Sequence, residues 1–345
     1  MFVKNAWYVA ASWDEVSRKP LGRVLLGEPV VLYRKEDGTA VALEDRCCHR
    51  RAPLHRGEVI GDALQCGYHG FTFDQTGACI KIPGMTTPPK TAKIKSYRVV
   101  ERHKWIWIWM GSAAPGMGEA TPDESMIPDF HQNDHPKWAS ARGYIPLAAN
   151  YLLYVDNLLD LSHVGFVHRD VIGSDDADAE LKFERHESLV QGVRQSPDMA
   201  PPPLYKKLGI GETVRQKKIM TFTPASHIAI DITTSEVLAG GKVGREAHIF
   251  VLNSITPERE NTCHYFWASA RDFDTANEQM TELVHRETLR AFIQDKDMVE
   301  AQQKVIDLDP EAAIVSVRAD SGGLLARRVV ADALQKESAG ASISN

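Results

Sequence analysis

Four residues in the first quarter of the chain have the types and the spacing of metal ligands. Cys47 and His49 are separated by one residue, and Cys66 and His69, after a gap of sixteen residues, are separated by two. The chain has 5 cysteines, an odd and small number that does not fit a disulfide framework. Thiol and imidazole groups in two short segments instead indicate that this part of the chain binds a metal.

The order of these donors limits which metal they could hold. A structural zinc site accepts two cysteines and two histidines, but it usually pairs cysteine with cysteine and histidine with histidine. Here each segment offers one cysteine and one histidine. That arrangement suits a Rieske 2Fe-2S centre, a one-electron relay in which one iron binds both sulfurs and the other binds both nitrogens. We favour the Rieske centre and keep zinc and an accidental grouping as alternatives.

A second set of candidate ligands lies at the end of a predicted helix. Asn157, Asp160 and His163 are three residues apart and therefore share one helical face. His163 and His168 are five apart, about 140° around a straight helix, so one continuous helix cannot direct both at one ion. Gly165 is expected to supply the break. The alternative is that the two histidines are satisfied separately at a helix end.

A carboxylate that completes such a site has three candidates in a second predicted helix, Thr275 to Val305. Two histidines and one carboxylate form the facial triad of non-haem Fe(II) oxygenases, which leaves coordination positions open for oxygen. Asp295, Asp297 and Glu300 are all available in this helix. An acidic residue in a charged helix is usually just solvated, so the spacing alone does not choose among them.

The elements that must position these residues divide the chain in two. Short strands separated by turn signals dominate the first third, and a Gly- and Pro-rich segment at 111–128 reads as a linker. We therefore expect an α+β protein with an all-β domain at 1–118 and a mixed domain at 119–345. The predicted strands are 24–26, 29–33, 40–43, 71–73, 78–82, 99–100, 105–109, 219–222, 227–233, 248–254 and 262–269; the helices are 150–162 and 275–305, and 198–207 is a loop.

Composition and charge argue against several other classes of protein. With 40 basic and 46 acidic residues the formal net charge is −6, which disfavours a nucleic-acid partner. No apolar run approaches membrane-spanning length, and the first residues lack the pattern of a signal peptide, so we expect a cytoplasmic protein with no membrane partner. No Gly-x-Gly-x-x-Gly follows a strand, so a nicotinamide cofactor has no predicted site in this chain.

Both sets of candidate ligands resemble those of the Rieske non-haem iron oxygenases. Arg46–Leu54 and Cys66–Gly70 are similar to the Rieske loops of the family, with cysteine at position 48 in place of the usual proline. The similarity covers nearly the whole chain and is greatest to the group that contains the oxygenase components of vanillate O-demethylase, toluenesulfonate methyl-monooxygenase and dicamba monooxygenase. It implies an N-terminal all-β Rieske domain followed by a catalytic domain of an antiparallel sheet with helices. Cys48, Cys79 and Cys263 are expected to be free, buried thiols.

The resemblance also assigns ligands and catalytic residues. It implies two iron centres, a Rieske 2Fe-2S cluster on Cys47, His49, Cys66 and His69 and a mononuclear Fe(II) on His163, His168 and Asp295, with Asp297 as second choice. Asn157 and Asp160 are implied to be catalytic. The Asp160 carboxylate, one turn before His163, is expected to accept the proton of that ring's free nitrogen. In the family this aspartate bridges to a cluster histidine of the partner subunit, here His69, in a head-to-tail homotrimer.

The resemblance implies an NAD(P)H-dependent monooxygenase that acts on a small aromatic acid with O2. Hydroxylation of a methoxy carbon gives a hemiacetal that loses formaldehyde; hydroxylation of an aryl methyl gives an alcohol, and ring hydroxylation is a further alternative. A flavin and 2Fe-2S reductase is expected to supply the electrons. His227 and Asn253 are weak candidates for binding the acid group. A Rieske electron carrier without its own catalysis is the alternative from another class, and it would not need the second iron site.

Overall fold

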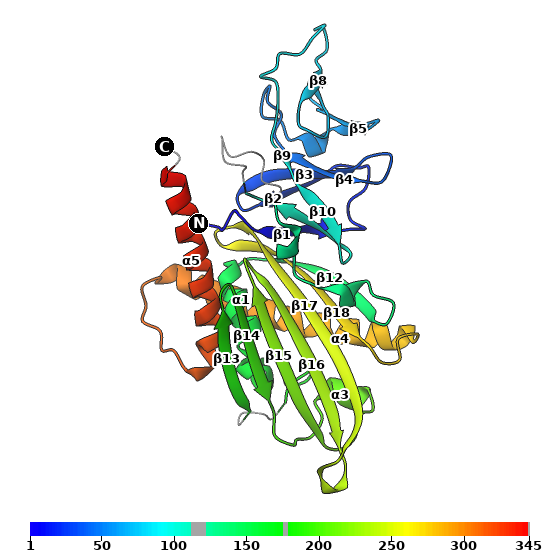
Figure 1. Cartoon of the computed structure of the whole chain (residues 1–345), viewed down its shortest axis with the longest axis vertical. Helices are drawn as coiled ribbons and strands as arrows, with labels where there is room; N and C mark the ends of the chain where they lie inside the picture. Colours follow the sequence, from blue (N-terminus) through cyan, green and yellow to red (C-terminus); the bar gives the residue numbers. More distant parts are fainter. Residues whose placement is uncertain (112–121, 175–178, 344–345) are drawn as a thin grey trace. The chain divides into compact units, whose positions relative to one another are not determined.

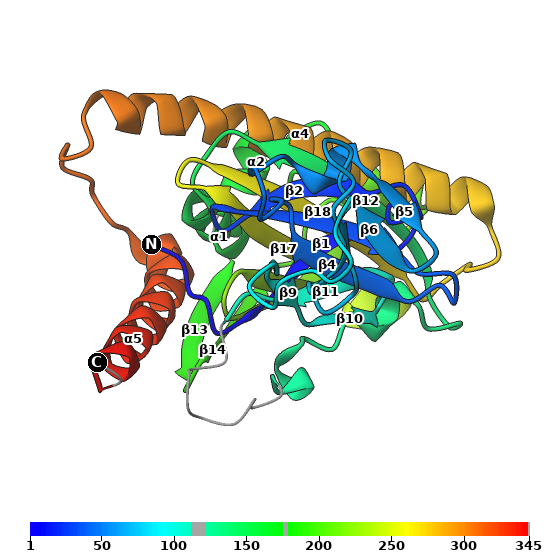
Figure 2. The same cartoon turned by 90° about the horizontal axis from the view of Figure 1, so that it is seen from above.

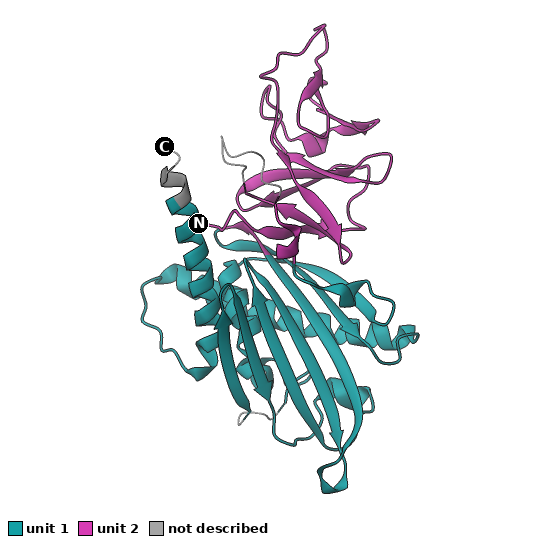
Figure 3. Ribbon diagram, viewed as in Figure 1, with its two compact units in different colours: residues 1, 128–255, 260–345 teal, residues 2–127, 256–259 magenta. Residues whose placement is uncertain are grey.

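The computed structural model describes residues 1–111, 122–174 and 179–343. The chain forms two compact units (Figure 3). The N-terminal unit holds Phe2–Ile127 with Thr256–Arg259, and the C-terminal unit holds Met1, Pro128–Ile255 and Glu260–Asn345. The predicted domain boundary, between residues 118 and 119, lies outside the described residues.

The N-terminal unit is built from three small antiparallel sheets, as the expectation of an all-β domain requires. The first has the order β1-β11-β10, with bounds Trp7–Ser12, Trp105–Trp109 and Val99–Arg102. The second has the order β2-β3-β4-β9, with bounds Leu21–Leu25, Glu28–Arg34, Ala40–Glu44 and Ser96–Tyr97. The third has the order β5-β6-β7-β8, with bounds Glu58–Ile60, Ala63–Gln65, Thr72–Phe73 and Cys79–Lys81.

Local sequence explains two of these strand pairings. The predicted hairpin at Asp37-Gly38 joins β3 to β4, and Gly38 has a φ of 85°, a conformation that costs little only for glycine. In β11 the residues Trp105 to Ile108 are all 0% exposed. This strand is covered on both faces, as its run of alternating tryptophan and isoleucine predicts.

The C-terminal unit is centred on one seven-stranded antiparallel sheet (Figure 1). Its strands are, in spatial order, β12 Ala139–Leu147, β18 Thr262–Arg271, β17 Val243–Arg259, β16 His227–Val237, β15 Val214–Thr223, β14 Leu189–Gln195 and β13 Glu180–His186. The four strands predicted between residues 219 and 269 correspond to β15 to β18, and each is longer than predicted because it continues to a turn. The sequence analysis did not identify β12, β13 or β14.

Five helices accompany this sheet in the described part of the chain. They are α1 Tyr151–Leu159, α2 Val164–Val167, α3 Pro203–Lys207, α4 Glu278–Leu308 and α5 Ser321–Ile343. The long helix α4 runs along one side of the sheet and contacts β12, β18 and α1 (Figure 2). The predicted loop at 198–207 ends in α3, and α5 was not predicted. None of the helices described here is both long enough and apolar enough to cross a membrane.

The helix α4 presents one buried face along its length. Its buried positions include Val284, Thr288, Ala291, Asp295 and Val299, which are three or four residues apart and therefore lie on one side of the helix. Asn277 begins the helix by accepting a hydrogen bond from the Met280 backbone N–H. An acidic residue thus occupies a position in the buried stripe where an apolar residue would be usual.

Candidate metal centres and substrate cavity

The two Cys/His loops of the N-terminal unit have the same backbone hydrogen bonds. One loop follows β4 and the other joins β6 to β7. In each, the cysteine N–H donates to the carbonyl five residues ahead, at 2.9 Å and 2.8 Å, and the cysteine carbonyl accepts from the N–H four residues ahead, at 2.9 Å and 3.0 Å. The donor of the second bond has a positive φ in both loops, 58° at Arg51 and 71° at Gly70. Each loop is therefore a closed turn that holds its cysteine on the inner side.

The sulfur donors of these loops are buried and the nitrogen donors are exposed. Cys47 and Cys66 are each 2% exposed, whereas His49 and His69 are exposed, with ring centroids 4.7 Å apart. A Rieske cluster binds two sulfurs at one iron and two nitrogens at the other, and this separation of buried sulfurs from exposed nitrogens matches it. Burial, together with the neighbouring Cys66, raises the pKa of the Cys47 thiol to about 11, so metal binding has to displace a proton.

The other cysteines and a nearby histidine do not join these donors. Cys79 and Cys263 are buried and not in a disulfide bond, as predicted, but Cys48 is exposed, so the prediction of a buried thiol there is wrong. Cys47 takes up the inner side of the turn, and the next residue, Cys48, lies on its outer side. His55 is held by the Asp45 carboxylate, which accepts from its backbone N–H at 2.7 Å and contacts its ring.

In the C-terminal unit three side chains from two distant segments converge. The Nε2 atoms of His163 and His168 lie 3.3 Å and 3.0 Å from the Asp295 Oδ1 atom. Ligand atoms of the three residues all lie within 4.8 Å of one another, and no other group of three or more potential ligands does so among the described residues. The four residues of the Rieske loops therefore do not converge on a single-ion position, which disfavours the zinc alternative.

The second nitrogen of each histidine ring is held by an oxygen atom. His163 Nδ1 lies 2.5 Å from the backbone carbonyl of Asp160, and His168 Nδ1 lies 2.9 Å from the Gln294 Oε1 atom. An oxygen partner at Nδ1 places the proton there and leaves the Nε2 lone pair free for a metal. The three residues thus fit a facial triad in donor type, in ring orientation and in convergence.

Charge also favours a cation at this position. Burial by itself would raise the pKa of Asp295, but the hydrogen bonds from His163 and His168 outweigh burial and lower that pKa to about 2. The pKa of His168 is raised, because the bond to Asp295 outweighs the effect of burial. Asn157 adds a hydrogen bond of 3.1 Å from its Nδ2 to Asp295 Oδ1, so a buried carboxylate is kept ionised and pointed at both rings.

The helix ends earlier than the sequence predicts, and this changes two expectations. The helix α1 stops at Leu159 because Asp160 has φ −105° and ψ 94°, outside the helical region. The chain then continues through a 3-10 turn and α2, so His163 and His168 are not on one continuous helix, as predicted. However, Gly165 is inside α2 and does not supply the expected break: His163 ends the 3-10 turn, and His168 follows the last residue of α2. The Asp160 carboxylate accepts a hydrogen bond of 2.8 Å from the Ser162 backbone N–H. The hydrogen bond from His163 Nδ1 goes to the Asp160 backbone carbonyl and not to the Asp160 carboxylate.

Asp297 and Glu300 are not brought to the histidines. Asp297 is exposed on the opposite side of α4, whereas Asp295 is 4% exposed on the buried side. Glu300 forms an ion pair with Lys296 and accepts a hydrogen bond of 2.7 Å from the Ala148 backbone N–H. Of the three acidic candidates, the structure therefore places only Asp295 beside His163 and His168.

A small, mainly apolar cavity of about 90 Å³ adjoins the three converging side chains. It lies between the helices and the sheet, and aliphatic and aromatic side chains make up most of its wall. Its helical side is lined by Asn157, Leu158, Leu161, His163, Val164, His168, Thr288, Ala291, Phe292 and Asp295. Its remaining lining residues are Ile172, Leu204, Tyr205, Gln216, Lys218, Ile230, Ile232, Ile249 and Val251.

The residues predicted to bind the acid group do not line this cavity. His227 and Asn253 are each 0% exposed inside the sheet. His227 Nδ1 lies 2.9 Å from the Ser254 hydroxyl, while Asn253 donates to the Ile228 carbonyl and accepts from the Tyr265 hydroxyl. Their polar atoms connect neighbouring strands, and a role for them in substrate binding stays a prediction. The sequence analysis missed Gln216 and Lys218, the polar side chains that do line the sheet side.

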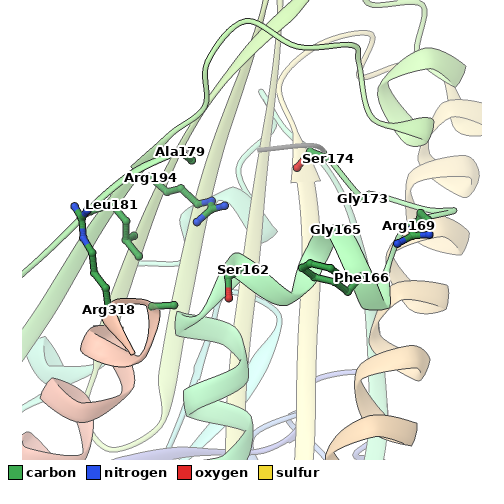
Figure 4. Close-up of a pocket in the computed structure, with 11 residues that line it drawn as sticks. Ser162, Gly165, Phe166, Arg169, Gly173, Ser174, Ala179, Leu181, Arg194 and Arg318 are labelled. Carbon is green, nitrogen blue, oxygen red and sulfur yellow. The ribbon is translucent and has the colours of Figure 1, made fainter. Parts of the chain in front are cut away.

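A second, wider cavity of about 600 Å³ is lined in part by the same short segment (Figure 4). Residues between 161 and 169 line both cavities with different side chains: His163 and His168 face the first, and Ser162 and Phe166 face the second. The wider cavity is also lined by three arginines, Arg169, Arg194 and Arg318. Positive charge is thus concentrated beside the segment that carries both histidines.

Comparison with known proteins identifies two matching family models. The Rieske [2Fe-2S] domain matches residues 6–98, and the vanillate O-demethylase oxygenase C-terminal domain matches residues 147–336. The first of these ranges contains both Cys/His loops, and the second contains the three converging side chains, the two histidines and Asp295.

Curated relatives and solved structures match almost the full length of the chain. The iron-sulfur subunit of the toluene-4-sulfonate monooxygenase system of Comamonas testosteroni is 42% identical over 93% of this chain and 94% of that protein. The vanillate O-demethylase oxygenase subunit of a Pseudomonas strain is 35% identical over 96% of this chain and 94% of that protein. The structure of dicamba monooxygenase bound to dicamba matches this chain with a TM-score of 0.87 and 33% identity. The structure of dicamba monooxygenase with non-heme iron and dicamba matches with a TM-score of 0.80 and 30% identity. Both alignments cover 98% of this chain and 99% of the other.

Proposed function

This chain belongs to the Rieske oxygenases whose C-terminal domain is of the vanillate O-demethylase type, and from that membership we propose that it is the terminal oxygenase component of a monooxygenase acting on a one-carbon substituent of a small aromatic acid. The observation that carries the proposal is the convergence of His163, His168 and Asp295 beside a small apolar cavity. An electron carrier without catalysis would have no use for such a pocket.

We assign the ligands by chemistry and position. The buried thiols of Cys47 and Cys66 and the exposed imidazoles of His49 and His69 hold the 2Fe-2S cluster, and His163, His168 and Asp295 hold Fe(II). When bound, these two iron centres supply electron transfer and O2 activation.

The other residues of the cavity prepare the substrate for this chemistry. Asp160 and Gln294 hold the two rings through their Nδ1 atoms, so the Nε2 atoms keep one direction. Asn157 holds the Asp295 carboxylate. The aliphatic side chains from β16 and β17 exclude water and fit an aromatic ring, whose methyl or methoxy carbon then faces the triad.

The relatives support two versions of the reaction. Hydroxylation of a methoxy carbon gives a hemiacetal that releases formaldehyde, in keeping with the names vanillate O-demethylase and dicamba O-demethylase. Hydroxylation of an aryl methyl to an alcohol is the second candidate, and the 42% identity to the toluene-4-sulfonate protein favours it. We further propose that a separate flavin and 2Fe-2S reductase passes electrons from NAD(P)H to this component.

We also propose that the chain acts as a head-to-tail homotrimer. His69 is exposed and Asp160 is only half-buried within its own subunit, so both side chains are available to a second copy. The ring would place the Asp160 carboxylate beside the partner subunit's His69 and give the electron a route between subunits.

A substrate screen tests the activity. The purified component, a flavin and 2Fe-2S reductase and NADH are incubated with vanillate, 4-methoxybenzoate and toluene-4-sulfonate, and O2 uptake, formaldehyde and benzylic alcohol are measured. We expect product in proportion to O2 consumed with at least one acid, and loss of product with Asp295→Asn but not with Asp297→Asn. NADH oxidation without any product from these acids would contradict the proposal.

A further inference from the structure

The sheet wall of the small cavity carries an amide side chain that the proposed function leaves unexplained. Gln216 lies on β15 and lines the cavity together with the aliphatic residues Ile230 and Ile232 of β16. It is 2% exposed, so its amide group is shielded from solvent. A buried amide needs partners for both its oxygen and its nitrogen, because each unpaired polar atom costs free energy.

The nitrogen of this amide has a partner, but the oxygen has none. Gln216 Nε2 donates a hydrogen bond of 2.9 Å to the hydroxyl of Thr234, the residue directly opposite on β16. Gln216 Oε1 is buried and has no hydrogen-bond partner among the described residues. Ser196 holds the backbone of Gln216, because its hydroxyl accepts from the Gln216 N–H at 2.8 Å and its N–H donates to the Gln216 carbonyl at 2.9 Å. The unpaired oxygen therefore belongs to a side chain whose position on the strand is fixed.

The proton of Thr234 fixes the orientation of the amide. The pKa of Tyr205 is raised to about 12, because burial outweighs a hydrogen bond with Thr234 that lowers it. A hydrogen bond that lowers the pKa of a phenol is one donated to the phenol oxygen. The Thr234 hydroxyl has one proton and donates it to Tyr205, so toward Gln216 it can only accept. Gln216 therefore has to turn its nitrogen toward Thr234 and its oxygen away from it.

We propose that Gln216 selects aromatic acids that carry a hydroxyl or another hydrogen-bond donor on the ring. The inference rests on the proposed function, because it narrows the substrate class of the same cavity. The ring hydroxyl donates to Gln216 Oε1 on the sheet wall, while the one-carbon substituent faces His163 and His168 on the helical wall. A ligand of this kind pairs an oxygen that the described part of the chain leaves unpaired.

The unpaired acceptor discriminates against two kinds of ring. A ring without a donor covers Gln216 Oε1 and keeps it from any partner, which costs free energy that a hydroxylated ring does not lose. A ring with only an acceptor at that position, such as a fluorine, brings two electronegative atoms together and binds no better. A site that forms a buried hydrogen bond to a substrate hydroxyl rejects analogues that lack the hydroxyl. The aliphatic side chains of the cavity select by size, whereas Gln216 selects by hydrogen bonding.

A second unpaired acceptor on the helical wall belongs to the candidate metal site. Asn157 Oδ1 is also buried without a hydrogen-bond partner in the described part of the chain. Its Nδ2 lies 3.1 Å from Asp295 Oδ1 and so holds a proposed iron ligand. The hydrogen bonds of Gln216 go instead to Ser196 and Thr234. A substitution at Gln216 can therefore change the choice of substrate without removing a support of the metal site.

Gln216→Met tests the proposal against Gln195→Met. Methionine has nearly the volume of glutamine but no oxygen, and Gln195 is exposed on β14 and does not line the cavity, so its variant is a matched control. The iron-loaded oxygenase is titrated by calorimetry with 3-methoxybenzoate, its 4-, 5- and 6-hydroxy derivatives and the matching fluoro derivatives. We expect at least one hydroxy acid to bind the wild type roughly 10-fold more tightly than 3-methoxybenzoate and the matching fluoro acid. Gln216→Met should reduce this preference to less than about threefold, and Gln195→Met should keep it.

Gln216→Glu is the conservative variant and also covers a failure to fold. A carboxylate keeps an acceptor at this position, so the preference for the hydroxy acid over 3-methoxybenzoate should persist even where the added charge weakens binding of both. If Gln216→Met loses the circular dichroism of the native protein, Gln216→Glu and the wild type must still show the preference. Loss of the preference in Gln216→Glu would mean that the acceptor is not what the site uses.

The remaining outcomes separate this inference from the proposed function. No preference for any hydroxy acid in the wild type would overturn the inference. A preference that survives Gln216→Met would also overturn it, because the hydroxyl would then pair with another acceptor such as Asn157. Product formed from the hydroxy acids and from 3-methoxybenzoate with equal KM would leave the proposed function standing. Hydroxyl-selective binding without any product would leave only the inference standing.

Discussion

The two candidate iron-binding regions of this chain hold their proposed ligands by opposite means. The Rieske loops take all four donors from residues 47–69, and backbone hydrogen bonds within each loop fix the turns. The catalytic site takes its donors from His163, His168 and Asp295, so it exists only when α4 packs against the end of α1. One site is local in sequence and the other depends on tertiary structure.

The candidate ligands of the two regions also differ in their exposure to solvent. His49 and His69 are exposed at the surface, whereas His163 is half-buried and His168 and Asp295 are 1% and 4% exposed. A centre that passes electrons to another protein or subunit needs an accessible edge. A centre that activates O2 next to a substrate needs protection from water and from side reactions. The comparison indicates that burial of each histidine pair follows the task of its iron.

The largest predicted effect separates the two sites by substitution. Cys66→Ser should abolish the Rieske visible absorbance and all turnover, because the proposed cluster loses one of its two buried cysteine ligands. His163→Ala should also abolish turnover but keep the Rieske absorbance, since its side chain belongs to the other site. Absorption spectra, iron and acid-labile sulfide content, and product formation measure both effects.

The same experiment can show that the two sites do not differ in the way described. Loss of Rieske absorbance in His163→Ala would mean that the two centres are not independent of each other. Retained turnover would remove His163 from the ligand set. Asp297→Asn, on the exposed side of α4, serves as the control and should leave spectrum and turnover unchanged.

A smaller effect is expected for the proposed connection between the sites. Asp160→Asn keeps the backbone carbonyl that holds His163, and asparagine can still cap the Ser162 N–H, so both metals should remain bound. Removal of the carboxylate charge should slow electron transfer from the cluster by roughly 10- to 100-fold, measured as the rate of cluster reoxidation in a single turnover with substrate and O2. An unchanged rate would refute the bridging role of Asp160.

The local site could be predicted from sequence more completely than the catalytic one. The spacing of Cys47, His49, Cys66 and His69 favoured a Rieske cluster over zinc, because each segment offers one cysteine and one histidine. The exposure of Cys48 was not predictable from composition, since free cysteine is usually buried and only the turn geometry places this one outside.

The catalytic site needed information that residue spacing lacks. The pair of histidines was identified from spacing, but the helix end at Asp160 was not, because a leucine-rich segment gives no local signal for it. Helical periodicity would have selected Asp295 if the buried positions had been followed along the whole helix. Asp295 falls on the same face as Val284, Thr288, Ala291 and Val299. Lys218 was missed because strand periodicity does not show which face of a two-sided sheet meets a cavity.

The smallest predicted effect concerns stability of the sheet that carries the first Rieske loop. Glu28 of β3 pairs with Lys4 at 2.6 Å and Lys95 at 2.9 Å. Burial would raise its pKa, but these partners and Tyr97 lower it from 4.5 to about 2, so the stabilisation is complete above pH 4.5 and is lost as the pH falls toward 2. Because the side chain is 31% exposed, we expect Glu28→Gln to cost about 1 kcal/mol at pH 7 and less at pH 3. Thermal loss of the Rieske visible circular dichroism measures this cost, with the exposed Glu36→Gln as control. An equal cost at both pH values would contradict the ionic origin, whereas a pH-dependent loss confined to the Rieske signal would extend the contrast between the two regions from chemistry to stability.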